Sequence, residues 1–348
     1  MEYNDTSRSL LALFPVAPFG VLTRLDQAVG RKTHSTTLPV AWAHPIWALA
    51  SPYWDCQSFG SEGGVIFSRD RFPELFLVEE HTYVYGNQPE RAAGTAQLGA
   101  AKVSIDTELD HPGGLWAAGN VVAVAVECTC CDIHANEVIF YEADGYDLTE
   151  VNRLVMDGSQ GEPNQNRRDH ASAVTFVRLR GGRYLTVVSG KFHEMFFYVS
   201  NTEELRPGTT WQYLGLWEPD CVETGDEIHP VASSCYGGVS GLAAFAQCDG
   251  TIFIAAMQGE TDNAPGGIVR SWVSIMELEQ DHVWGEIELV QRDYRYLWGE
   301  NHIFGEGESM RWGSTLQVND DGTITGLVTE RDHDNYELDV HRVLDVGP

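Results

Sequence analysis

The chain has 348 residues, 43% of them hydrophobic, which is enough to bury a sizeable core and excludes disorder as the state of the whole chain. Its 51 acidic residues against 22 lysines and arginines give a formal net charge of −29, which repels nucleic acid and anionic membranes. No apolar run reaches the ~18 residues of a spanning helix, and the apolar segment 10–22 lacks a signal-peptide cleavage pattern. We therefore expect a cytoplasmic monomer or small homo-oligomer that takes a neutral or cationic small molecule, with no nucleic acid and no membrane as partner.

Short runs of β-branched and aromatic residues, bounded by Gly, Asp and Asn, recur along the chain and predict an all-β fold. A short helix is expected only in connections, for example at 147–152. The runs group into five units, at approximately 34–80, 111–158, 170–218, 236–293 and 310–345.

The last unit has three runs where the others have four. The run GVLTRLD at 20–26 has no unit of its own. We expect it to add the missing strand, because pairing the two ends of the chain closes a ring of sheets and protects their edges. Residues 1–19 are then an N-terminal extension.

Units of about 50–75 residues with four strands each, the last completed from the N-terminus, resemble a five-bladed β-propeller. The resemblance is architectural, covers roughly residues 20–345 and implies one domain over 1–348. Glycosidases of this shape usually carry an aspartate in the first inner strand, where this chain has His34 and TTLPVAWA, so a glycosidase is not favoured. Six blades, if 81–105 or 295–310 holds strands, and a two-sheet sandwich are the alternatives.

Two Asp-His pairs, Asp110-His111 and Asp169-His170, each open a pair of apolar runs. In a propeller blade the start of the first strand and the end of the second share one face near the axis. His34, His111 and His170 would then lie at equivalent positions, with Glu127 beside them. Imidazoles suit Zn, Cu or Fe, so the three histidines predict one divalent metal ion. Without metal, one histidine would be a general base tuned by a carboxylate, and the simplest alternative is that each histidine only caps a strand.

The same face would collect the other candidates. The catalytic candidates are His111, His170, Glu127 and Tyr236. The candidates for substrate binding are Trp312, Arg311, Tyr53, Gln258, Lys191 and Glu330. An acidic loop pair, Glu260 and Asp262, together with Asp132 would suit a Ca²⁺ ion instead.

Seven cysteines, an odd number, are expected to be reduced thiols. Cys128, Cys130 and Cys131 lie close to His134, which suggests a reactive thiol or a soft metal site. The alternative is that the cysteines are buried small side chains with one disulfide, such as Cys221–Cys235.

These patterns predict an enzyme that acts on a small organic molecule at the mouth of the axial channel. His and carboxylate acid–base chemistry fits a hydrolase, lyase or cyclase, with or without a metal. The alternative function is a carbohydrate or small-ligand binding propeller without catalysis, and a protein-interaction scaffold is the third possibility.

Overall fold

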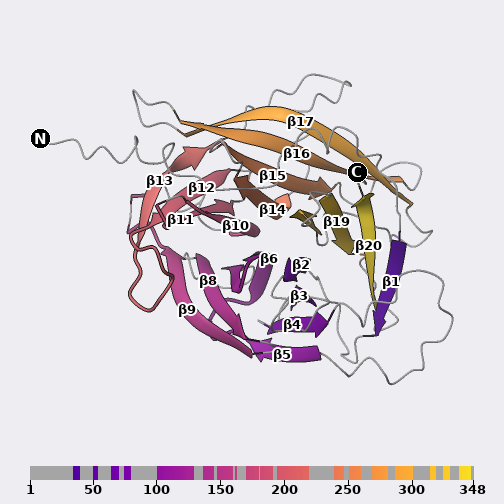
Figure 1. Cartoon of the computed structure of the whole chain (residues 1–348), viewed down its shortest axis with the longest axis horizontal. Helices are drawn as coiled ribbons and strands as arrows, with labels where there is room; N and C mark the ends of the chain where they lie inside the picture. Colours follow the sequence, from indigo (N-terminus) through magenta and orange to yellow (C-terminus); the bar gives the residue numbers. More distant parts are fainter. Residues whose placement is uncertain are drawn as a thin grey trace, which may run out of the picture.

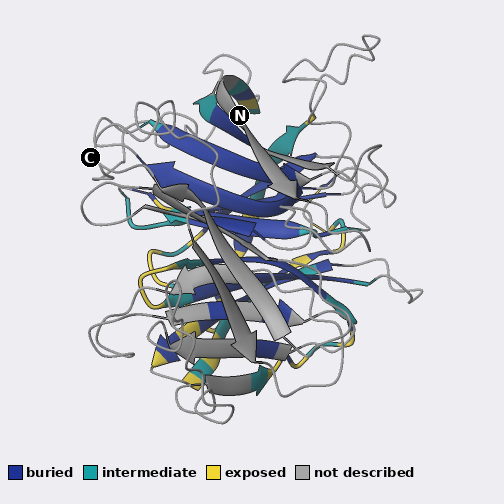
Figure 2. Cartoon of the chain, turned by 90° about the vertical axis from the view of Figure 1, so that its right-hand side faces the viewer, coloured by how far each residue is buried: buried dark blue, intermediate teal, exposed yellow. Residues whose placement is uncertain are grey.

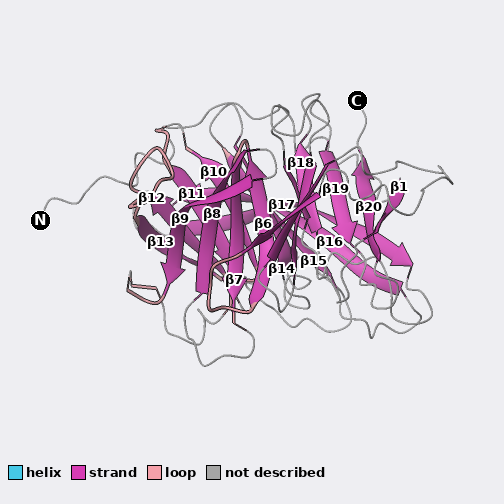
Figure 3. Ribbon diagram, turned by 90° about the horizontal axis from the view of Figure 1, so that it is seen from below, coloured by secondary structure: helices cyan, strands magenta, loops and turns pink. Residues whose placement is uncertain are grey.

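The structure of the protein is a computed structural model. It describes residues 34–39, 50–53, 64–69, 74–79, 100–128, 136–144, 147–159, 161–162, 170–179, 181–190, 194–218, 239–246, 251–259, 268–280, 287–300, 314–318, 324–329 and 337–345. Every regular element in these ranges is a strand (Figure 3). Within them, no helix is present that is long and apolar enough to cross a membrane.

The strands follow one another in chain order from β1 to β20. They are β1 (His34–Pro39), β2 (Ala50–Tyr53), β3 (Gly64–Arg69), β4 (Glu74–Glu79), β5 (Ala100–Ser104), β6 (His111–Ala118), β7 (Val121–Glu127), β8 (Asn136–Asp144), β9 (Asp147–Met156), β10 (Ala173–Arg178), β11 (Tyr184–Ser189), β12 (Met195–Ser200), β13 (Trp211–Trp217), β14 (Val239–Ala246), β15 (Ile252–Gly259), β16 (Ile268–Gln280), β17 (Ile287–Glu300), β18 (Ser314–Val318), β19 (Ile324–Thr329) and β20 (Glu337–Asp345).

The described strands pair into five antiparallel sheets of four. Their orders are β2-β3-β4-β5, β6-β7-β8-β9, β10-β11-β12-β13, β14-β15-β16-β17 and β1-β20-β19-β18. Figure 1 shows the sheets arranged around a common centre, with β6, β10 and β14 toward it and β9, β13 and β17 on the outside. The contacts between inner strands run β2, β6, β10, β14, β18 and back to β2. The architecture is therefore all-β and propeller-like.

Three of the units read from the sequence agree closely with sheets. The units at 111–158, 170–218 and 236–293 correspond to β6–β9, β10–β13 and β14–β17, although β17 extends to Glu300. The expected helix at 147–152 is wrong, because these residues begin β9 and pair with β8.

The first and last units need correction. The strand that completes the last sheet is β1, which pairs with β20 along its whole length, and 20–26 lies outside the described residues. The first sheet consequently begins at β2 and takes β5, from within the 81–105 segment, as its outer strand. Pairing with β1 satisfies the backbone groups that β20 would otherwise leave at a sheet edge.

The core lies between neighbouring sheets, so the inner strands are apolar on both faces. In β7, Val122, Val124 and Val126 join the cluster shared with the β2–β5 sheet, whereas Ala123 and Ala125 join the cluster shared with the β10–β13 sheet. Figure 2 shows the resulting buried strands in dark blue. A strand packed on both faces reads as a continuous apolar run rather than an alternating one, which is the pattern of VVAVAVE.

Candidate functional site

Glu127 and His111 face each other across a strand pair. His111 is the first residue of β6 and Glu127 the last of β7, and the antiparallel register places them opposite one another. The Nε2 atom of His111 lies 3.6 Å from Oε1 of Glu127. The Gly119-Asn120 turn reverses the chain between β6 and β7, and a register shift between Pro112 and Leu115 then brings His111 opposite Glu127. Gly119 has φ of 62°, a conformation that glycine adopts without the strain of a Cβ.

His170 reaches the same carboxylate from the next sheet. It lies in the segment that leads into β10, and its Nδ1 atom is 3.2 Å from Oε2 of Glu127. The backbone N–H of Ala171 donates a hydrogen bond to that same oxygen at 2.7 Å. The Glu127 carboxylate therefore presents one oxygen to each imidazole and joins two sheets.

The exposure of the three side chains is graded. The side chain of Glu127 is 6% exposed, that of His111 16% and that of His170 30%. A buried carboxylate needs partners that replace water, and here the Ala171 amide and the His170 imidazole supply them, with His111 3.6 Å away. Nδ1 is the nitrogen of the His170 ring that faces Glu127. A carboxylate placed beside one ring nitrogen can fix the orientation of an imidazole.

A bulge beneath the cluster lets the two sheets approach closely. The register of β6 and β7 shifts between Pro112 and Leu115, at Gly113 and Gly114. The N–H of Gly114 donates to the carbonyl of Ser172 at 2.7 Å. A Cβ at Gly113 would lie 2.7 Å from that carbonyl oxygen, so the approach requires glycine.

The inner strands β6 and β14 also contact each other, at Trp116 and Phe245. The ring of Trp116 on β6 meets that of Phe245 on β14 edge-on, with centroids 6.0 Å apart. Both rings are buried. Inner strands from two different sheets are therefore in direct contact through aromatic side chains.

The structure does not bring His34 to this cluster. His34 begins β1, the outermost strand of its sheet, and pairs with Arg342 of β20 rather than starting an inner strand. The expectation that three histidines occupy equivalent inner positions is therefore wrong for His34. Across the described ranges, no group of three or more His, Cys, Asp or Glu side chains is arranged to hold a metal ion. The residues do not fit the expected three-histidine metal site, and no step below is routed through a metal.

The remaining candidates are only partly placed. Gln258 lies on β15 opposite Val239 and is 1% exposed, and Tyr53 ends β2. The others lie outside the described residues: Tyr236, Trp312, Arg311, Lys191, Glu330, Asp132, Glu260 and Asp262. Their roles stay predictions.

The cysteine cluster is corrected at one position. Cys128, directly after Glu127, is disulfide-bonded, and its partner lies outside the described residues. The expectation of reduced thiols is wrong for this residue, and a disulfide sulfur is not a thiolate nucleophile. Cys128 also packs against the apolar cluster beside β7, so it holds the end of the strand that carries Glu127.

Sequence reasoning missed a buried carboxylate in the connection that leads toward His170. Glu162 is 7% exposed and accepts a hydrogen bond from the hydroxyl of Tyr198 at 3.3 Å. The ring of Tyr198 lies against that of Tyr213. Burial raises the pKa of Tyr213 to about 12, and the charges of Glu162 and Glu218 add to the effect. A glutamate in a loop has no sequence signal that distinguishes it from a solvated one.

A second missed feature is the Ala171 N–H that holds Glu127. A backbone donor is present at every residue except proline, so only the tertiary structure can single one out.

No protein-family model and no curated protein matches the sequence. Similar solved structures include a GDP-Man-dependent mannosyltransferase from Leishmania mexicana, which is 12% identical with a TM-score of 0.45 over 92% of this chain and 91% of that one. A bifunctional GH43-CE protein from Bacteroides eggerthii is 11% identical with a TM-score of 0.41 over 91% of this chain; the chain spans only 36% of that protein's length. The Bacillus licheniformis rhamnogalacturonan lyase is 8% identical with a TM-score of 0.36 over 88% of this chain and 75% of that one. At these values the likenesses carry no argument about activity.

Proposed function

We propose that the chain is an enzyme that acts on a small organic molecule, with His170 as general base or acid and Glu127 as the carboxylate that orients it. One observation carries the proposal: a carboxylate that is 6% exposed is shared between two imidazoles, 3.2 Å from one and 3.6 Å from the other. A buried carboxylate beside two partly exposed imidazoles is typical of sites for proton transfer.

The proposed roles of the three residues follow from how exposed each side chain is. His170, the most exposed of the three, exchanges a proton with the substrate through Nε2. Glu127 holds the Nδ1 side of that ring and stabilises the imidazolium that forms when His170 takes up a proton. His111 contacts the other carboxylate oxygen and sets its charge environment. Proton abstraction and return of this kind suit a hydrolase, lyase or cyclase.

The fold and the charge of the chain support the same site. We infer that the five sheets are the blades of one five-bladed propeller, which the circuit of contacts between inner strands supports. The cluster then lies at one mouth of the axis, where loops on a rigid scaffold carry function. The net charge of −29 favours a neutral or cationic substrate over an anionic one.

The proposal is tested by turnover and by substitution of His170. The purified chain is incubated with a panel of neutral and cationic esters, lactones, amides and glycosides, and consumption is followed by mass spectrometry. We expect turnover of at least one class, lowered by about 10²–10⁴-fold in His170→Ala. The matched control, His341→Ala on β20 of another sheet, should keep full activity.

Two outcomes contradict this assignment. Turnover that is equal in His170→Ala and the unsubstituted chain removes His170 from catalysis. Ligands that raise the thermal stability of the chain but are never consumed would indicate the binding propeller in place of the enzyme.

A further inference from the structure

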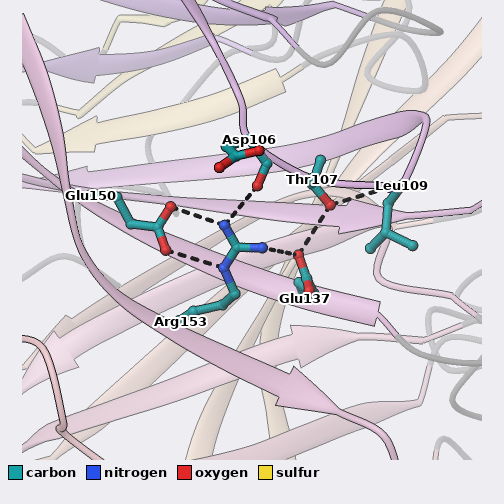
Figure 4. A network of polar contacts seen from close by, with 6 residues as sticks. All are labelled: Asp106, Thr107, Leu109, Glu137, Glu150 and Arg153. Carbon is teal, nitrogen blue, oxygen red and sulfur yellow. Dashed lines mark hydrogen bonds and ion pairs between the residues drawn. The ribbon is translucent and has the colours of Figure 1, made fainter.

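We propose that a polar network around Arg153 is a latch that sets the position of His111. The catalytic consequence of this inference rests on the proposed function, whereas the structural part does not. The network contains Asp106, Thr107, Leu109, Glu137, Glu150 and Arg153, and Figure 4 shows it from close by.

The connection from β5 to β6 delivers His111 to the site. Ile105 and Leu109 in this connection are each 4% exposed and belong to the apolar cluster that also holds Val124 and Val126 of β7. The connection is thus attached to the same cluster that supports the strand carrying Glu127. Burial of Ile105 and Leu109 keeps the connection against the core. Apolar contacts are not directional, however, so the position of the connection along the sheet depends on its polar contacts.

The hydroxyl of Thr107 supplies one directional contact. It donates to Oε2 of Glu137 at 3.1 Å and accepts a hydrogen bond from the backbone N–H of Leu109, also at 3.1 Å. Leu109 is two residues before His111. The hydroxyl therefore shapes the last turn before the histidine and ties that turn to β8.

Arg153 on β9 supplies the other contacts. Its Nη1 atom donates to Oε2 of Glu137 at 2.7 Å, and its Nη2 atom donates to the carbonyl oxygen of Asp106 at 2.7 Å. The two oxygens of Glu150 accept from Nε and Nη2 at 3.1 and 2.9 Å. A planar guanidinium held on both sides by carboxylates has a fixed orientation, so it fixes the Asp106 carbonyl in turn.

The latch contacts both the connection that leads to His111 and the strand next to the one that carries Glu127. Glu137 pairs with Val126, the neighbour of Glu127, and its Oε2 atom is shared by Arg153 and Thr107. The contact from His111 to Glu127 measures 3.6 Å, just beyond hydrogen-bond range. The connection that precedes His111 sets the length of this contact, so the latch acts on His111 without touching it.

The test compares Thr107→Val, which keeps the shape but loses the hydroxyl, with Thr107→Ser, which keeps the hydroxyl. The readout is the imidazole ¹H–¹⁵N spectrum, with the His111 signals assigned from their loss in His111→Ala. We expect the His111 signals to shift in Thr107→Val and to stay in place in Thr107→Ser, and kcat to fall by about tenfold in Thr107→Val alone with KM little changed. Thermal unfolding of each variant separates this effect from a general loss of stability.

Arg153→Lys is a second and independent variant, because lysine keeps the positive charge but lacks the planar guanidinium with its several N–H donors. It should shift the same His111 signals by a smaller amount. His111 signals that stay in place in both folded Thr107→Val and Arg153→Lys would overturn the latch. Shifted signals with unchanged kcat would support the latch and remove His111 from the proposed chemistry.

Discussion

The Nδ1 atom of His170 lies 3.2 Å from Oε2 of Glu127, although His170 precedes β10 and Glu127 ends β7 of the neighbouring sheet. The N–H of Ala171 binds the same oxygen at 2.7 Å. The carboxylate is therefore both a part of the candidate site and a link between two sheets. The two roles can be tested separately in a variant that keeps the hydrogen bond from Ala171 and removes the negative charge of Glu127.

Glu127→Gln is that variant. The amide oxygen of glutamine can still accept from Ala171, so the fold should be retained, but an uncharged amide no longer stabilises a protonated imidazole. We expect kcat to fall by about 10²-fold with little change in the thermal unfolding temperature. Glu288→Gln, at an exposed carboxylate on β17, is the matched control and should change neither quantity. Full activity in Glu127→Gln would show that the charge of Glu127 is not used.

Gly114→Ala tests the close approach of the two sheets. A Cβ at this position would lie 2.7 Å from Cβ and 2.8 Å from Cα of Ala173. We expect the free energy of unfolding to fall by about 1–3 kcal/mol, because β6 and β10 must separate, as measured in urea. Gly215→Ala is the control: its Cβ would meet only the flexible end of Ile287 at 3.3 Å, so its cost should be about 1 kcal/mol or less. Equal costs in the two variants would contradict the close packing.

Asn152→Ala tests a buried hydrogen-bond network between β9 and the neighbouring sheet. Asn152 accepts from Nε1 of Trp211 at 2.7 Å and donates to the carbonyls of Arg206 and Thr209 at 3.1 and 3.0 Å. Alanine leaves these groups without their partner, so we expect a loss of about 2–4 kcal/mol in the free energy of unfolding. The exposed amide of Gln212 is the control, and Gln212→Ala should change stability by less than about 0.5 kcal/mol.

Tyr213 is one of three tyrosines whose burial should make the stability of the chain fall at alkaline pH. Burial raises its pKa to about 12 from the ordinary value of 10, so folding favours the neutral phenol. The unfolded chain then loses this proton at lower pH than the folded chain, and the contribution of Tyr213 to stability is present below pH 10 and lost as pH rises toward 12.

We expect Tyr213→Phe to reduce the fall in unfolding free energy across this pH range, as measured by urea unfolding at several pH values. Tyrosinate absorbance during an alkaline titration reports the same group directly. Burial also raises the pKa of Tyr141 and Tyr184, so part of the dependence should persist in the variant. An identical pH dependence with and without the Tyr213 hydroxyl would contradict the prediction.

The strands of three sheets, and a shared face for His111 and Glu127, could be predicted from the amino-acid sequence. Continuous apolar runs such as VVAVAVE identify strands packed on both faces, and a short turn at Gly119 identifies where the chain reverses between β6 and β7. Because both signals are local, they can be read without knowing the fold.

Contacts between distant parts of the chain establish which segment completes the last sheet and which groups meet at the site. Both 20–26 and 34–39 have the composition of strands, and the choice depends on which of them reaches the β20 edge. Because the segment that pairs with β20 is 34–39, His34 lies on an outermost strand and is not equivalent to His111 and His170.

The Ala171 N–H, the disulfide at Cys128 and the Arg153 network likewise depend on segments that are distant in sequence. Backbone donors and surface arginines occur throughout any chain, and only their positions in space give them a role. The sequence could therefore identify His111, His170 and Glu127 as candidates, while the contacts that hold them together followed from the packing of one sheet against the next.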